Sequence, residues 1–329
     1  MSDGTKIEWT DATWNPITGC SVVSAGCKHC YAMKLAGTRL QHHPSRAGLT
    51  IDTKEGPVWN GQVRFNKQWL RQPLQWKRPR QIFVCAHSDL FHENVKTEWI
   101  ERVLTVTLSA KRHVFQILTK RPDRMREVMQ RWTDMNGRPQ PNLWLGVSVE
   151  DQAAADERIP LLLQTPAAVR WISAEPLLGP VYLTRLTIIE PDGNSPGVWL
   201  NSLAGHVIGP DDILDTKIDW VVAGGESGLK ARPMHPDWAR DLRDQCATAG
   251  VPFLFKQWGE WTPGVNVDRQ RGTVDTATLW GDRWHINPLN LATDNGHIDD
   301  EPDLYRVGKK ASGRLLDGKL HDGYPEAQP

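Results

Sequence analysis

Short apolar runs rich in β-branched and aromatic residues alternate along this chain with segments whose apolar residues recur at helical spacing. Continuous apolar runs of this kind are typical of parallel strands that are covered on both faces. The segments of helical spacing predict helices at residues 97–110, 121–132, 151–163 and 235–249. We predict one strand before Cys20 and further buried strands at residues 81–86, 114–118, 143–148, 169–173, 220–223 and 252–255.

The predicted strands and helices alternate, which indicates an α/β fold built from repeated βα units. About seven strands in this order predict a partial or near-complete parallel (β/α) barrel. One interval, between the strands at 169–173 and 220–223, contains an insertion at about residues 184–217 that is rich in Gly, Pro and Asp. No period is evident after the last strand. We therefore predict a barrel domain at residues 1–262 and a loop-rich C-terminal extension at residues 263–329.

The composition is that of a globular protein rather than a disordered one, because 39% of the 329 residues are hydrophobic and 24% are charged. Lys and Arg together number 39, as do Asp and Glu, so the net charge is zero. This balance excludes a uniformly basic nucleic-acid coat protein and an acidic tail protein. The sequence has no apolar run long enough to span a membrane and no signal-peptide core near Met1. We expect a cytoplasmic protein with no membrane partner.

The charge is unevenly distributed along the chain. Residues 60–135 contain 15 Lys and Arg against 7 Asp and Glu, whereas residues 150–230 contain 5 against 12. A local basic rim could attract phosphates, although a run of charge is more often a solvated face. The 16 tryptophans also allow two interpretations. They suit either a large aromatic core or stacking surfaces for flat ligands such as bases.

Polar and ionisable residues follow almost every predicted strand. In βα barrels the chemistry takes place at the carboxyl ends of the strands. Loops are polar in any protein, but this regular placement indicates an active-site rim. The residues concerned are Cys20, His87-Ser88-Asp89, Thr119-Lys120-Arg121, Ser148, Glu150, Glu175, Gly224-Gly225-Glu226-Ser227 and Lys256-Gln257.

Three of the five cysteines, Cys20, Cys27 and Cys30, have the spacing Cys-x6-Cys-x2-Cys on one loop. In a reducing compartment, clustered thiols indicate metal or redox chemistry more often than disulfides. Three thiolates could bind a 4Fe-4S cluster with one open iron, or a zinc ion with one histidine, or they are purely structural. We interpret the other two, Cys85 and Cys246, as packing residues. Candidates for a fourth zinc ligand are His29, His87 and His92.

A three-cysteine loop just after the first strand of a βα-repeat protein resembles the radical S-adenosylmethionine (SAM) enzymes, whose usual spacing is Cys-x3-Cys-x2-Cys. This chain has three additional residues in the first gap. Over about residues 5–262 the sequence is also similar to a family of bacteriophage and prophage proteins named for a three-Cys motif. The shared runs are Trp14-Asn15-Pro16, Ser88-Asp89-Leu90-Phe91-His92, Leu118-Thr119-Lys120-Arg121-Pro122, Gly224-Gly225-Glu226-Ser227-Gly228 and Phe255-Lys256-Gln257-Trp258-Gly259.

The sequence distantly resembles the spore photoproduct lyase branch as well, in which a Thr-Lys pair after the third strand and a Ser after the fourth help to bind SAM. The matching positions are Thr119-Lys120 and Val147-Ser148. Together these resemblances imply a barrel of the radical SAM type with a 4Fe-4S cluster and SAM as cofactors. The implied cluster ligands are Cys20, Cys27 and Cys30, and the implied SAM-binding residues are Lys120, Ser148, Glu150, Glu175, Gly224, Gly225 and Glu226.

The activity implied by the resemblance is reductive cleavage of SAM to methionine and a 5′-deoxyadenosyl radical, which abstracts a hydrogen atom from the substrate. An external one-electron reductant of the flavodoxin or ferredoxin type is implied as a partner. The basic segment, the aromatic residues and the lyase-like pattern favour a nucleic acid as substrate, in repair or modification. The alternatives are a peptide or small-molecule substrate, a zinc-dependent nucleic-acid-binding module without catalysis, and a phage-related structural protein.

Overall fold

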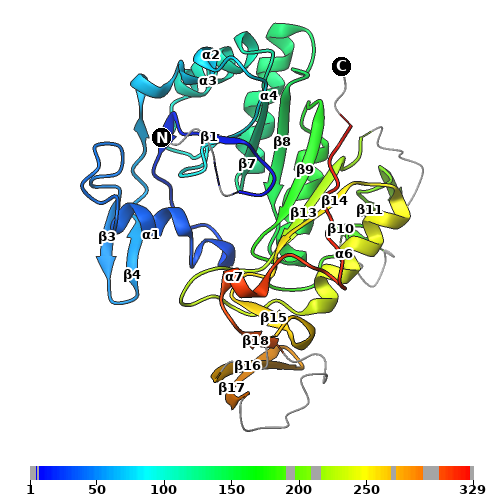
Figure 1. The fold of residues 1–329 in the computed structure, drawn as a ribbon. Helices are drawn as coiled ribbons and strands as arrows, with labels where there is room; N and C mark the ends of the chain where they lie inside the picture. Colours follow the sequence, from blue (N-terminus) through cyan, green and yellow to red (C-terminus); the bar gives the residue numbers. More distant parts are fainter. Residues whose placement is uncertain are drawn as a thin grey trace.

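Seven strands form one parallel sheet that curls into a half-barrel in the computed structural model of the protein, which describes residues 5, 7–189, 197–208, 216–267, 272–291 and 304–326 (Figure 1). The order of the strands in the sheet is their order in the chain. The strands are β1 (Ala12–Trp14), β6 (Gln81–Val84), β7 (Val114–Thr119), β8 (Leu143–Ser148), β9 (Val169–Ala174), β13 (Trp220–Gly224) and β14 (Phe253–Gln257). Apolar runs predicted six of these strands and the seventh was expected before Cys20, so the α/β fold with a partial parallel barrel is confirmed.

Four helices follow strands of the sheet and pack on its outer face. Each of the four segments predicted from helical spacing is a helix, and the last one ends at Gly250 in the left-handed conformation. Apolar residues of the helices and the outward-facing residues of the strands, such as Ile82, Ile172 and Val221, form one continuous core. The helices are α3 (Thr97–Ser109), α4 (Pro122–Asn136), α5 (Gln152–Leu163) and α6 (Pro236–Ala249).

The inner face of the half-barrel is filled with aromatic side chains. Successive residues of a strand point to opposite faces of a sheet, so the neighbours of the outward-facing residues point inward. Gly146 on β8 leaves the space that the indole of Trp171 occupies, since a Cβ at this position would lie 2.6 Å from that ring. The packing interpretation of the tryptophans is confirmed for this set, which comprises Trp9, Phe83, Trp144, Trp171 and Trp220.

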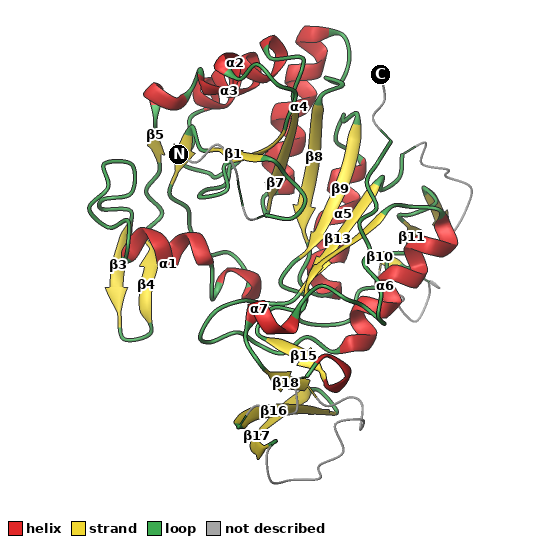
Figure 2. Ribbon diagram, viewed as in Figure 1, coloured by secondary structure: helices red, strands yellow, loops and turns green. Residues whose placement is uncertain are grey.

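The long connection between β1 and β6 carries the three-cysteine loop. After the short strand β2 (Ile17–Thr18) the chain forms this loop, which leads directly into α1 (Tyr31–Gly37). A projecting hairpin of β3 (Thr50–Thr53) and β4 (Gly56–Trp59) packs beside α1 (Figure 2). The connection ends with β5 (Arg64–Phe65), which pairs with β2, and the short helix α2 (Gln72–Gln75).

The predicted insertion at about residues 184–217 contains a small antiparallel sheet. Its strands are β10 (Leu186–Ile189), β11 (Val198–Asn201) and β12 (His206–Ile208). Residues 190–196 and 209–215 of the insertion lie outside the described residues. The described part packs against α5, so the insertion adds a layer beside the barrel and does not interrupt its sheet.

The segment predicted as a loop-rich extension contains regular structure. A second antiparallel sheet has the order β15-β18-β16-β17. The hairpin of β16 and β17 in this sheet was not predicted, because its residues show no period. Residues 268–271, 292–303 and 327–329 of the extension lie outside the described residues. The strands are β15 (Trp261–Pro263), β16 (Thr273–Trp280), β17 (Arg283–Asn290) and β18 (Leu304–Arg306), and α7 (Lys309–Ser312) follows them.

The end of the chain covers the open side of the half-barrel. Residues 321–323 run antiparallel to the free edge of β14, where Phe255 donates to the carbonyl of His321 and Gly323 donates to that of Phe253. The ring of Tyr324 stacks on Trp220 at 5.1 Å, and its hydroxyl donates to the carbonyl of Glu8. The C-terminal segment therefore completes the aromatic core of the barrel. Of the helices in the described ranges, none has the length and apolar character needed to cross a membrane.

Candidate functional site

A cavity of about 300 Å³ opens at the carboxyl ends of the sheet strands. This is the end at which βα barrels place their reactive groups. Apolar side chains, among them Trp9, Phe83 and Leu118, line its inner part. Eight of the ten residues predicted to bind the cluster or SAM line this one cavity, although they are far apart in the sequence: Cys20, Cys27, Cys30, Lys120, Ser148, Glu175, Gly225 and Glu226.

The two other predicted residues, Glu150 and Gly224, lie behind the wall of the cavity. Glu150 is 1% exposed, and it contacts Lys120 and Arg158 rather than open space. A Cβ on Gly224 would lie 2.8 Å from Oε1 of Glu175, so this glycine makes room for the carboxylate of Glu175. Both residues therefore support side chains that reach the cavity.

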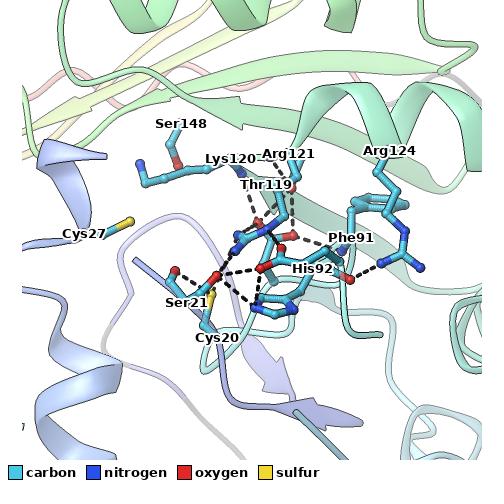
Figure 3. A network of polar contacts seen from close by, with 12 residues as sticks. Cys20, Ser21, Cys27, Phe91, His92, Thr119, Lys120, Arg121, Arg124 and Ser148 are labelled. Atoms are coloured by element: carbon cyan, nitrogen blue, oxygen red, sulfur yellow. Dashed lines mark hydrogen bonds and ion pairs between the residues drawn. The ribbon is translucent and has the colours of Figure 1, made fainter. Parts of the chain in front are cut away.

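The beginning of the cysteine loop is bound by Arg121, which follows β7 (Figure 3). The Arg121 guanidinium donates to Oγ of Ser21 at 2.6 Å and lies 3.8 Å from Sγ of Cys20. Ion pairs with Asp89 at 3.1 Å and Glu93 at 2.7 Å hold the guanidinium in this position. Asp89 also accepts hydrogen bonds from the hydroxyl of Thr119. A cation is thus fixed beside the first thiol of the loop.

The middle of the loop is bound by Glu150. The amide of Gly26 donates to Oε1 of Glu150 at 3.3 Å, while Oε2 accepts from Lys120 at 3.2 Å and from Arg158 at 2.9 Å. A Cβ on Gly26 would lie 3.1 Å from the Glu150 carboxyl carbon, so the loop approaches closely because residue 26 has no side chain. The Lys120 side chain extends past Arg121 towards Ser148 and Cys27 (Figure 3).

The lowered pKa of Glu150 makes the stability of the folded protein depend on pH. Burial alone would raise this pKa, but the charges of Lys120 and Arg158 and a hydrogen bond with Ser24 outweigh it and lower the pKa from 4.5 to about 2. A carboxyl group with a lowered pKa in the folded state stabilises that state above its unfolded pKa, and the contribution is lost as the pH falls towards the folded pKa. The shift corresponds to about 3 kcal/mol at neutral pH.

We therefore expect Glu150→Gln to lower the free energy of unfolding most strongly above pH 4.5, where the wild-type carboxylate is ionised in both states. The difference between the wild type and this variant is expected to shrink as the pH falls from 4.5 towards 2. Urea unfolding at a series of pH values measures it. Glu157→Gln on the exposed side of α5 is the matched control, and its effect is expected to stay small. A difference for Glu150→Gln that is constant across the pH range would contradict the role of this ionisation.

Glu226 and Arg232, which follow β13, bind the loop at His29 and at Ala25. Arg232 donates to Glu226 through Nε at 2.9 Å, through Nη2 at 2.6 Å and through its backbone amide at 2.8 Å. Arg232 Nη2 also donates to the carbonyl of Ala25, and Nδ1 of His29 lies 3.0 Å from Glu226. Burial opposes ionisation of Glu226, but the hydrogen bonds with Arg232 and His29 lower its pKa. The sequence indicated Glu226 as a candidate site residue. It gave no signal for Arg232, which lies in no recognisable motif.

The glycines of the Gly-Gly-Glu run allow close packing within the protein. A Cβ on Gly225 would lie 1.9 Å from the carbonyl oxygen of Trp258, and one on Gly259 would lie 2.1 Å from the carbonyl oxygen of Glu226. The turns after β13 and β14 are therefore in direct backbone contact. This contact places Gly225 and Glu226 at the cavity.

A further ion pair lies on the wall formed by the later strands. Lys256 from β14 lies 3.0 Å from Oε1 of Glu175, which follows β9, and the hydroxyl of Ser173 donates to Oε2 of Glu175 at 3.3 Å. Both charged side chains are less than 20% exposed to solvent. Four carboxylates at or beside the cavity are thus paired with cations: Asp89 with Arg121, Glu150 with Lys120, Glu175 with Lys256 and Glu226 with Arg232.

The donor chemistry of the loop fits a thiolate-bound metal group. Cys20, Cys27 and Cys30 are free, half-buried and face one cavity. Burial raises the pKa of Cys20 to about 12 and also raises that of Cys30, so metal binding would have to release protons from these thiols. In the described ranges no three His, Cys, Asp or Glu side chains are drawn together closely enough to hold a metal ion. Loading would therefore require the thiols to move closer to one another.

The candidate histidine ligands differ in their availability. His29 contacts Glu226, as described above. His92 is fully buried, accepts from the amide of Asn94 through Nδ1 and lies 3.0 Å from the hydroxyl of Ser21 through Nε2. Nδ1 of His87 is buried and has no hydrogen-bond partner. Two of the three candidates for a fourth zinc ligand are thus engaged in bonds that position the loop.

The two remaining cysteines lie in different places. Cys246 on α6 is fully buried in the core, so its interpretation as a packing residue is confirmed. Cys85 is also buried, but it lies at the end of β6, lines the cavity and has a positive φ of 60°. Burial raises the pKa of each thiol to about 12. Neither is a reactive thiolate at neutral pH.

Most of the basic runs do not form a rim around the cavity. Lys77, Arg78 and Arg80 directly precede β6, and Lys111 and Arg112 precede β7. The starts of parallel strands lie at the end of the sheet opposite to the cavity, so these five residues form an exposed group far from it. Of the two interpretations of the basic segment, the solvated face therefore applies to these five residues, whereas Lys120 and Arg121 of the same segment line the cavity.

Comparison with known proteins identifies a family. No curated protein and no solved structure matches the chain significantly. The sequence model of the family DUF5131, which is described as a protein of unknown function, matches residues 4–325. Because this match covers nearly the entire chain, the protein belongs to the DUF5131 family.

Proposed function

We propose that this protein is a radical SAM iron–sulfur enzyme whose reaction site is the cavity at the carboxyl ends of the half-barrel strands. The observation that supports the proposal best is that the three thiols share one cavity with Lys120, Ser148, Glu175 and Glu226. Chance placement of these residues is a poor explanation, because they come from one long loop and four different strand ends. The half-barrel with its aromatic interior provides the closed inner surface that such chemistry requires.

In this proposal Cys20, Cys27 and Cys30 would hold a 4Fe-4S cluster. When bound, the cluster supplies the electron that cleaves SAM to methionine and a 5′-deoxyadenosyl radical. The residues of the chain position the loop: Arg121 binds its start, Glu150 and Arg232 bind its middle, and Glu226 binds its end. Fixing a loop by three charged groups in advance reduces the reorganisation that loading requires.

Lys120 is the residue proposed to bind the carboxylate of SAM. Its ammonium group lines the cavity and uses one donor on Glu150, which leaves two donors for a ligand. Glu175 and Glu226, each neutralised by its own cation, would accept hydrogen bonds from the amino or ribose groups. Trp9, Phe83 and Leu118 exclude water from the inner part of the cavity.

We expect Lys120→Ala to weaken SAM binding by about tenfold or more, because a charged hydrogen bond is lost in a partly buried site. Cluster content is expected to stay unchanged, since Glu150 keeps its ion pair with Arg158. Equilibrium binding of SAM to the reconstituted protein measures the effect. Lys111→Ala, at the opposite end of the sheet, is the matched control. Equal SAM affinity of Lys120→Ala and the wild type would remove Lys120 from the site.

The substrate proposed from the sequence is a nucleic acid, and the reductant is proposed to be a flavodoxin or ferredoxin. The exposed side of the cysteine loop is where a reductant would approach, because Val22 and Val23 there are 45% and 47% exposed. The basic runs before β6 and β7 lie away from the cavity, so they would not bind the phosphates of a substrate held in it.

The proposed function is tested by anaerobic purification, reconstitution with iron and sulfide, and incubation with SAM and dithionite. We expect a brown protein with about four irons per chain that produces 5′-deoxyadenosine. A protein that binds one zinc ion, remains colourless and produces no 5′-deoxyadenosine would overturn the proposal. That result would favour a zinc-binding module without catalysis.

A further inference from the structure

A β-bulge turns two consecutive residues of β14 towards the cavity. The strands β13 and β14 pair in register as far as Ala223 with Phe255. The next pair is Gly224 with Gln257, so Lys256 is an additional residue in β14. Successive residues of a regular strand point to opposite faces of a sheet, whereas a bulge redirects a side chain. Lys256 and Gln257 accordingly both line the cavity.

The side chain of Gln257 is held in place but has one unpaired end. Its Nε2 donates to Oγ of Ser227, which follows β13, at 2.9 Å. Its Oε1 is buried and has no hydrogen-bond partner, and the whole residue is 6% exposed. A buried carbonyl oxygen without a donor is destabilising. This oxygen is therefore suited to a donor that a ligand brings into the cavity.

A second buried polar group on the cavity wall also lacks a partner. Trp9 lines the inner part of the cavity, is 2% exposed and has a buried Nε1 without an acceptor. Among the described residues that line the cavity, Trp9 and Gln257 are the two with an unpaired buried side-chain atom. The indole nitrogen is a donor and the carboxamide oxygen is an acceptor. A ligand that pairs with both must offer one acceptor and one donor.

The remaining groups of the cavity favour a neutral and flat ligand. Four carboxylates at or beside it are already paired with cations, as described above. A phosphate or an ammonium group would have to compete with these buried pairs. Trp9 and Phe83 provide an aromatic surface in the inner part of the cavity, which suits a planar ring.

We propose that Gln257, Ser227 and Trp9 form a subsite for a nucleobase of the substrate, in which Oε1 of Gln257 accepts from an N–H group of the base. Nucleobases carry N–H donors and acceptors side by side on the edges of a flat ring. Enzymes that act on a base bind it in a pocket by hydrogen bonds to such an edge and by stacking on aromatic or apolar side chains. That the base belongs to the substrate rests on the proposed function of the cavity.

The test uses the full chain as purified, without reconstitution, so that its outcome does not depend on the cluster. Titration calorimetry measures the dissociation constants of uridine, 3-methyluridine and acetamide. A methyl group replaces the N3–H donor in 3-methyluridine, and acetamide has a donor and an acceptor but no ring. We expect uridine to bind about tenfold more tightly than 3-methyluridine, which leaves Oε1 of Gln257 unpaired, and more tightly than acetamide.

Gln257→Met is the decisive variant, and Gln130→Met on the exposed side of α4 is its matched control. We expect Gln257→Met to bind uridine about tenfold more weakly and to lose the preference for uridine over 3-methyluridine. Gln130→Met is expected to retain both the affinity and the preference. If Gln257→Met does not fold, Ser227→Ala replaces it with the same expected direction, because it removes the hydroxyl that holds the carboxamide.

A wild type that does not bind uridine, or a preference for uridine that persists in Gln257→Met, overturns the subsite. Equal affinities for uridine and acetamide would also overturn it and would indicate a peptide amide instead of a base. A short single-stranded oligouridine distinguishes the two sources of the base. Tighter binding than that of uridine, with the same loss in Gln257→Met, indicates a base within a strand, and equal binding indicates a free nucleoside. All of these results leave production of 5′-deoxyadenosine to decide the proposed function separately.

Discussion

Cys30→Ala is expected to abolish iron loading and all production of 5′-deoxyadenosine. A three-thiolate site that loses one ligand cannot hold a cluster with one open iron. Cys30 is well placed for this role, because it lies in the cavity at the start of α1 and its backbone is part of the helix end. Iron content after anaerobic reconstitution, the absorbance of the brown protein and the yield of 5′-deoxyadenosine measure the effect.

The control for this experiment is Cys246→Ala, which removes a thiol of α6 that is buried in the core. We expect this variant to retain its iron content and to lose only modest stability, as for a small cavity in a core. A brown and active Cys30→Ala protein would show that Cys30 is not a ligand. The proposed chemistry would then need another donor at this position.

Arg232→Ala is expected to lower the free energy of unfolding by about 3 kcal/mol, because it leaves the Glu226 carboxylate buried without its cation. Glu226 is 7% exposed and receives two side-chain hydrogen bonds from Arg232. The variant also loses the bond to the carbonyl of Ala25, so we expect Cys27 and Cys30 to react faster with a thiol reagent. Urea unfolding and the rate of thiol modification measure the two effects.

Arg243→Ala on α6 is the matched control, because Arg243 pairs with Asp244 and Asp317 on the surface. Pairs of this kind contribute about 1 kcal/mol or less. If Arg232→Ala were as stable as Arg243→Ala and its thiols reacted no faster, Arg232 would have no part in holding the loop. The cysteine loop would then be held in place by contacts other than those of Arg232.

The arrangement of the sheet could be predicted from the sequence because its signal is local. A strand that is covered on both faces is mostly apolar, so six of the seven strands appear as apolar runs, and only the short β1 does not. The order of a parallel sheet with short crossovers then follows from the order of these runs. The prediction that the cysteine loop and Lys120 share one end of the barrel depends on the same rule.

The hairpin of β16 and β17 shows a local signal that was overlooked. Residues 273–280 and 283–290 flank Gly281-Asp282, which is a typical two-residue hairpin turn. Its strands are largely exposed and only partly alternate, so they produce no apolar run. A search for turn residues between two β-rich segments would have found this hairpin, whereas a search for apolar runs could not.

The roles of the carboxylates depend on tertiary structure. Glu150 and Glu175 have the same side chain and both follow a strand, yet Glu150 holds the loop from behind the wall and Glu175 reaches the cavity. Arg232, which pairs with Glu226, has no distinguishing sequence context. Which cation meets which carboxylate is determined by the packing of loops from distant parts of the chain.

By itself the sequence determined the seven-stranded parallel sheet, its four covering helices and the position of the cysteine loop at the carboxyl end of β1, because hydrophobic periodicity and topology are local properties. Only the tertiary structure decided that the tryptophans fill the barrel, that three charged groups hold the loop and that the basic runs lie opposite the cavity. These features arise from contacts between residues separated by up to two hundred positions, for which the sequence contains no periodic signal.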